Sequence, residues 1–153
     1  DGEKLMLEEQ AKRLAKIEPS LSSSLVSGTL SPDGRFIFFA DSTRPRLLEV
    51  ITDEDGKPSF QKVPLPMEVE GGCRGLFNSA SETLILASEI GALVFISLVE
   101  SPTTGAIEAK IAKVFSRATG STKTIEELDE DEEEEASPVV SMAASDDGQW
   151  LAW

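Results

Sequence analysis

The sequence predicts an all-β protein made of repeated four-stranded antiparallel sheets, the architecture of a fragment of a β-propeller. Three observations support this fold class: a turn-and-strand unit recurs along the chain, the strands are short and joined by turns, and several strands are apolar throughout. A strand with one wet face alternates between apolar and polar residues, whereas a sheet covered on both faces does not. Radially packed blades are covered in this way, each lying between two neighbours.

The first unit runs from a strand over residues 25–30, through a turn over 31–34, into an apolar strand over 36–40. Pro32 presets the second position of this turn and Gly34 closes the fourth. Two further turns lead to strands over 47–51 and 59–63. Four short strands in sequence are typical of one propeller blade.

Two more copies of the unit follow. In the last copy, Ser145 to Gly148 repeat the turn and residues 149–153 repeat the apolar strand. A weaker copy lies between them, with strands over 75–77, 84–88, 92–98 and 110–115, and with Glu82 where a glycine is expected. Aligning Phe36 with Leu84 gives a spacing close to the roughly 40–45 residues of a blade.

The units define the expected domain organisation. We predict one blade over 21–66, a second over 67–115 and the truncated start of another over 139–153. Residues 116–138 are rich in Ser, Thr and acids, so they are expected to form a disordered acidic insertion loop. Residues 1–20 fit equally the end of a preceding blade or a linker helix.

Composition and charge exclude several classes of function. The net charge is −14, and nine of the acids lie within residues 126–135, so a general coating of nucleic acid is not expected. The single cysteine, Cys73, permits no internal disulfide, which favours a reducing compartment. No apolar run is long enough to span a membrane, so no membrane partner is predicted.

The residues needed for common catalytic sites are missing. The chain has no histidine, which removes the usual general base and most zinc sites, so we predict no enzyme activity, no catalytic residue, no cofactor and no metal site. Asp33 and the acids at 53–55 are interpreted as turn residues, and Cys73 as a structural cysteine. The large aromatic residues are assigned to blade cores: Phe36, Phe38, Phe39, Phe95, Trp150 and Trp153.

Two features remain as candidates for partner binding. Arg44 and Arg46 flank Pro45 in a turn predicted to be exposed at the blade edge, where they could meet a phosphate or a partner's carboxylates. The acidic loop could bind a basic partner, or be phosphorylated at Ser121, Thr122 or Thr124. Its central acids are Glu130, Asp131, Glu132 and Glu133. For both features, simple solvation is the alternative interpretation.

The stretches 31–36 and 145–152 resemble the turn-and-strand units of WD-repeat propellers, although the chain has no Gly-His and no Trp-Asp pair. Within that group the chain is similar to the cirhin-like tandem-propeller proteins of the UtpA subcomplex in the small-subunit processome. The similarity covers most of residues 21–153. It implies a nuclear, nucleolar protein that binds partner propellers and the 5′ external transcribed spacer of ribosomal precursor RNA.

We therefore expect a non-enzymatic scaffold in ribosome biogenesis and ribosomal RNA processing. Its expected partners are other proteins of a large complex, including other propellers, together with the remaining blades of the same parent chain and pre-ribosomal RNA. Two alternatives stay open at this point. One is a propeller enzyme, such as a lactonase or a peptidase-associated domain, and the other is a WD-type adaptor in signalling or ubiquitin ligation.

Overall fold

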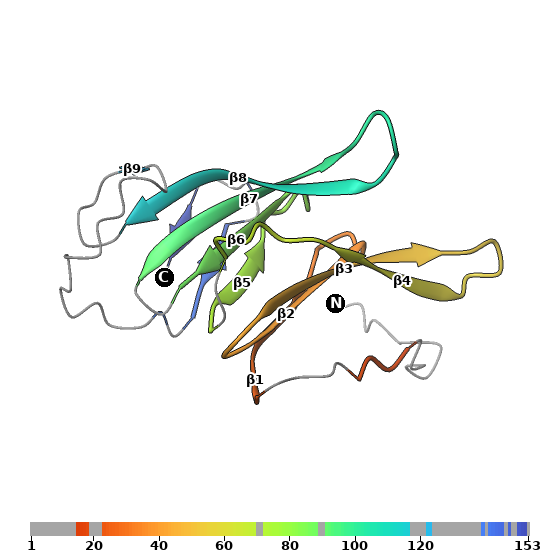
Figure 1. Cartoon of the computed structure of the whole chain (residues 1–153), viewed down its shortest axis with the longest axis horizontal. Coiled ribbons are helices and arrows are strands. Elements are labelled where there is room, and N and C mark those ends of the chain that lie inside the picture. Colours follow the sequence, from red (N-terminus) through yellow and green to blue (C-terminus); the bar gives the residue numbers. More distant parts are fainter. Residues whose placement is uncertain are drawn as a thin grey trace, which may run out of the picture.

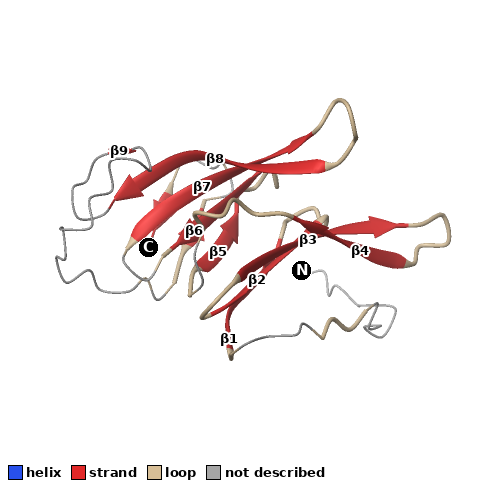
Figure 2. Cartoon of the chain, viewed as in Figure 1, coloured by secondary structure: helices blue, strands red, loops and turns tan. Residues whose placement is uncertain are grey.

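The computed structural model describes residues 15–18, 23–69, 72–88, 91–116, 122–123, 139, 141–145, 147 and 150–152. Every regular element within these ranges is a β-strand, and all the strand pairs are antiparallel (Figures 1 and 2). The predicted all-β class is therefore confirmed. Of residues 1–20, only 15–18 are described, and they form neither strand nor helix. No helix of the described chain could cross a membrane.

The first sheet is a four-stranded meander in the order β1-β2-β3-β4. Its strands are β1 (Leu25–Leu30), β2 (Phe36–Asp41), β3 (Pro45–Thr52) and β4 (Pro58–Val63). All four strands were predicted from the turn chemistry, but β3 begins two residues earlier than expected. Arg46 therefore lies in a strand and not in an exposed turn, which corrects that part of the prediction.

The second sheet has the same meander order with a fifth strand added at its outer edge. Its strands are β5 (Arg74–Phe77), β6 (Thr83–Ala87), β7 (Ala92–Glu100), β8 (Ile107–Ser116) and β9 (Thr122–Lys123). The last strand pairs with Val114 and Phe115. The predicted loop over 116–138 is thus wrong at its start, because Ser116 ends β8 and part of the segment forms a strand.

The third sheet has two strands, β10 (Ala143–Ala144) and β11 (Leu151–Ala152). Trp150, which precedes β11, was predicted to be core, but it is 77% exposed. Its counterpart Phe36 is buried because strands lie on both sides of β2 and the second sheet covers its face. Among the described residues, β11 pairs with β10 alone. Trp153 lies outside those residues.

The main core lies between the first two sheets. Phe36, Phe38 and Ala40 of β2 belong to one cluster with Leu84 and Leu86 of β6. The rings of Phe36 and Phe77 stack with their centroids 6.3 Å apart. Cys73 is buried in the same cluster, and this burial raises the pKa of its thiol to about 11. The cysteine is therefore placed as a core residue and not as a reactive thiolate.

The second sheet is covered on its other face as well. Ala87 and Leu93 form a separate cluster with Val139, and Met142 and Leu151 pack against it. Arg74 links the layers, because its Nε donates to the carbonyl of Val139 at 2.8 Å. The second sheet is thus the middle layer of three, which explains why β6 is apolar at every position from 84 to 87.

Candidate functional site

The turns at one rim of the sheets share a single hydrogen-bond pattern. The Ser31 hydroxyl donates to Asp33 Oδ1 at 2.6 Å and accepts from the Phe36 backbone at 2.8 Å. The Ser145 hydroxyl does the same with Asp147 at 2.6 Å and with Trp150 at 2.9 Å. Burial raises the pKa of Asp33, but hydrogen bonds from Ser31, Arg35 and Ser81 lower it by more. Asp33 is therefore a turn residue, as its sequence context indicated.

The second sheet builds the equivalent turn from different residues. The Asn78 side chain replaces serine and accepts from Thr83 N at 2.9 Å. Ser81 occupies the place of Gly34, since both have a positive φ, 61° and 75°. Phe36 is therefore equivalent to Thr83, one residue before the Leu84 that the sequence alignment chose. The positive φ also falls on Ser81 and not on Glu82.

The opposite rim of the first sheet is organised by Asp41, whose side chain is fully buried. Its Oδ1 accepts from Thr43 N at 2.8 Å, Thr43 Oγ1 at 2.7 Å and Arg44 N at 2.7 Å, and Arg46 is an ion-pair partner at 3.0 Å. The hydrogen bond from the Thr43 hydroxyl lowers the pKa of Asp41 most, and Arg46 lowers it further. An ionised carboxylate thus shapes the turn that carries Arg44.

A cleft of about 330 Å³ opens beside this turn. We call it the basic cleft, and it is lined by Thr43, Arg44, Pro45, Arg46, Lys62, Val63, Pro64, Leu65, Pro66 and Val69. The structure therefore brings both predicted arginines to one hollow and adds Lys62, which the sequence reasoning missed. The Pro64-Leu65-Pro66 sequence after an expected strand was the available signal.

The basic cleft exists because β4 stops early. Pro64 has no N–H to donate to a strand ladder, and a second proline follows at Pro66. Pairing between β3 and β4 therefore begins at Leu47 and Val63, so Pro45 and Arg46 extend past the end of β4. In the second sheet β8 continues to Ser116 and pairs along β7 as far as Ala92. A strand therefore occupies the position that corresponds to the basic cleft of the first sheet.

The three cations that line the basic cleft differ in whether an acidic partner neutralises them. The Arg46 guanidinium is paired with buried Asp41 and lies 5.9 Å from the Phe39 ring centroid. Arg44 and Lys62 are exposed, and neither side chain has a hydrogen-bond or ion-pair partner within the described part of the chain. Among the described residues, no acidic side chain lines the cleft. Two cations therefore remain available to an anionic group.

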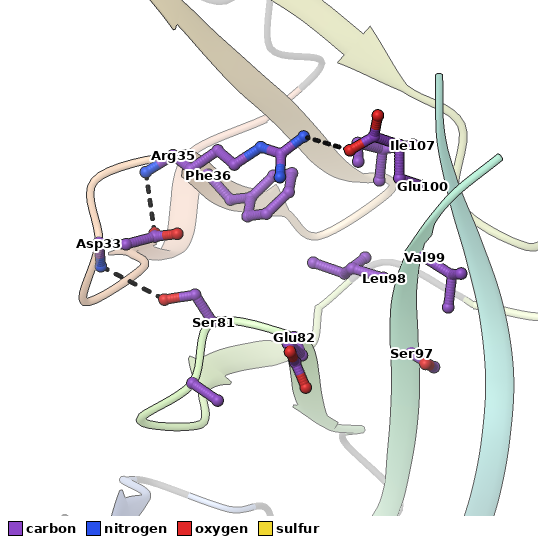
Figure 3. Close-up of a pocket in the computed structure, with 11 residues that line it drawn as sticks. Asp33, Arg35, Phe36, Ser81, Glu82, Ser97, Leu98, Val99, Glu100 and Ile107 are labelled. Atoms are coloured by element: carbon purple, nitrogen blue, oxygen red, sulfur yellow. Dashed lines mark hydrogen bonds and ion pairs between the residues drawn. The ribbon is translucent and has the colours of Figure 1, made fainter. Parts of the chain in front are cut away.

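A second cleft, of about 480 Å³, lies at the opposite rim between the first two sheets (Figure 3). Arg35 pairs with Glu49 at 2.8 Å in its own sheet and reaches Glu100 of β7 at 3.7 Å. Its guanidinium carbon also lies 5.3 Å from the Phe36 ring centroid. Arg35 already has acidic partners from both sheets. We therefore interpret its ion pairs as contacts that align the two sheets, and not as a site for a ligand.

The remaining predicted site residues cannot be placed in the described part of the chain. Glu130, Asp131, Glu132 and Glu133 lie outside the described residues, as do Ser121 and Thr124. Within the described part of the chain, no group of three or more acidic, His or Cys side chains could hold a metal ion. No protein-family model matches the chain, and no curated protein matches it.

Proposed function

We propose that this chain forms consecutive blades of a β-propeller that serves as a non-enzymatic scaffold in ribosome biogenesis. The observation that carries the proposal is the way the two four-stranded meanders stack. Equivalent turns fall at the same rim of each sheet, and the second sheet lies between the first sheet and the β10–β11 pair (Figure 1). Successive sheets covered on both faces are what a propeller requires.

The free face of the first sheet supports the same arrangement. On the second sheet, Leu84, Ile96 and Leu98 face the first sheet as part of the main core. The ladder registers make Ile37 and Leu48 equivalent to Leu84 and Ile96. Both are only half-buried and belong to neither core cluster of the described residues. We infer that a further sheet covers this apolar face in the assembled protein.

The scaffold role follows from this architecture and from the residue chemistry. Strands fixed on both faces present rigid turns and clefts to partners, while the chain contains no histidine to act as a general base. The proposed setting is the nucleolar small-subunit processome, with other propellers and precursor ribosomal RNA as partners. The resemblance of the stretches 31–36 and 145–152 to WD-repeat units supports this setting.

Affinity purification of the endogenous, tagged protein tests the assignment. We expect co-purification of small-subunit assembly factors, enrichment of precursor ribosomal RNA containing the 5′ external transcribed spacer, and nucleolar fluorescence of the tag. A matched purification of an unrelated tagged nuclear protein provides the background. Recovery of neither assembly factors nor precursor RNA above that background would overturn the proposal.

A further inference from the structure

We propose that the basic cleft binds an acidic peptide segment of a partner protein, with carboxylates on Arg44 and Lys62 and an apolar side chain against the proline wall. The inference rests on the proposed scaffold function, since it names one class of partner for that scaffold. The binding reaction itself can be measured without reference to ribosome assembly.

The positions of the cations favour a peptide carboxylate. Asp41 accepts hydrogen bonds from the backbone of Thr43 and Arg44, so the turn that carries the Arg44 side chain is fixed before a ligand arrives. A guanidinium can bind a carboxylate through two parallel hydrogen bonds. Lys62 lies near the end of β4, also lines the cleft, and can take a second carboxylate.

The walls of the cleft give it an apolar component. Pro64, Leu65, Pro66 and Val69 are among the lining residues, and Leu65 and Val69 are partly buried against the main core. Their positions are therefore supported by the fold, and the prolines restrict the backbone between them. A ligand that inserts an apolar side chain here removes apolar surface from water at little ordering cost.

The same features disfavour nucleic acid as the occupant of this cleft. Affinity for a phosphate backbone grows with the number of phosphates that are neutralised, and among the described residues that line this cleft only Arg44 and Lys62 are cations without an ion-pair partner. The proline wall also offers no aromatic ring for a base to stack on.

The test is a fluorescence-anisotropy titration of the full chain with a labelled, glutamate-rich peptide that carries one central leucine, at about 0.15 M salt. The double variant R44E/K62E should weaken peptide binding by about tenfold or more. The control K57E/K113E makes the same change in net charge at two exposed lysines outside the cleft and should change the affinity by less than about twofold. Thermal midpoints establish that both variants fold.

Equal losses in the two double variants would show that only net charge matters and would overturn the site. Absence of peptide binding to the unmodified chain would do the same. A labelled single-stranded RNA forms the second arm, and binding of that RNA, but not of the peptide, through Arg44 and Lys62 would also refute the assignment. The scaffold proposal is judged separately by the affinity purification, so either proposal can fail alone.

Discussion

Asp41 fixes the β2–β3 turn by accepting hydrogen bonds while its carboxylate is buried and ionised. Replacing it in the variant Asp41→Asn removes the charge opposite Arg46 and turns one acceptor oxygen into a donor group. We expect the thermal midpoint of the variant at neutral pH to fall by on the order of 10 °C, measured by circular dichroism. An unchanged midpoint would contradict the role assigned to this carboxylate.

The same residue predicts a dependence on pH. The folded-state pKa of Asp41 lies below its unfolded value, which is near 4, so its stabilising effect is complete above that value and is lost as the pH falls toward the folded-state pKa. The stability gap between the native chain and Asp41→Asn should therefore be largest above about pH 5 and shrink on acidification. A gap that stays constant down to pH 2 would contradict this assignment.

The buried Ser31 hydroxyl makes two hydrogen bonds, one to Asp33 and one from the Phe36 backbone. The variant Ser31→Ala leaves the Phe36 N–H without this acceptor, which should lower the free energy of unfolding by about 1–3 kcal/mol in urea titrations. Ser59→Ala is a suitable control because Ser59 is exposed and its hydroxyl donates, among the described residues, to the Ile51 carbonyl alone, so a change within about 0.5 kcal/mol is expected.

At the scale of the elements, β5 approaches β2 closely at Gly75. A Cβ atom built on Gly75 would lie 2.3 Å from Cδ1 of Phe38, whose side chain is fully buried. We expect Gly75→Ala to destabilise the fold by about 1–3 kcal/mol through overpacking. In the double variant Gly75→Ala/Phe38→Leu, the smaller side chain at position 38 should restore part of the lost unfolding free energy.

Gly28 provides the matched control for this contact. A Cβ atom at Gly28 would meet only the carbonyl oxygen of Phe38 at 3.8 Å, and the residue does not have a positive φ. Gly28→Ala should therefore be neutral or slightly stabilising, by up to about 1 kcal/mol. Equal destabilisation by the two alanines would show that strand propensity, and not the sheet-to-sheet contact, determines the effect.

Most strands could be predicted from the sequence, because proline, glycine and aspartate in the turns and apolar runs in the strands carry local signals. The second unit was misaligned by one residue, because Asn78 replaces serine and Ser81 replaces glycine. The Asn78 hydrogen bond and the positive φ of Ser81 reveal these equivalences. Thr122–Lys123 pair with the nearby residues Val114 and Phe115 of β8, but this Ser- and Thr-rich stretch carries no strand signal in the sequence.

The basic cleft was foreseen in part. The pair Arg44 and Arg46 was visible in the sequence, but only the structure shows that Arg46 is neutralised by the buried Asp41 while Arg44 has no ion-pair partner among the described residues. The contribution of Lys62 depends on the register of β3 and β4, which places Lys62 opposite Leu48. Neither of these tertiary facts follows from residue spacing.

At the scale of the whole molecule, equivalent positions on the two sheets should respond differently to truncation. Ile96 is fully buried between the sheets, while its counterpart Leu48 lies on the free face. In the isolated chain, Ile96→Ala should cost roughly 2–5 kcal/mol of unfolding free energy and Leu48→Ala no more than about 1 kcal/mol. Similar costs would show that the free face is already covered.

The position of Cys73 gives the molecule a built-in reporter. The chain has one thiol, it is 3% exposed in the main core, and the raised pKa keeps it protonated at neutral pH. The thiolate is the species that attacks an alkylating reagent, so modification requires an opening of the fold that exposes Cys73 to solvent. The rate of labelling therefore reports how often the native fold opens, and no engineered probe is needed. A ligand or neighbouring sheet that holds the layers together will slow the labelling.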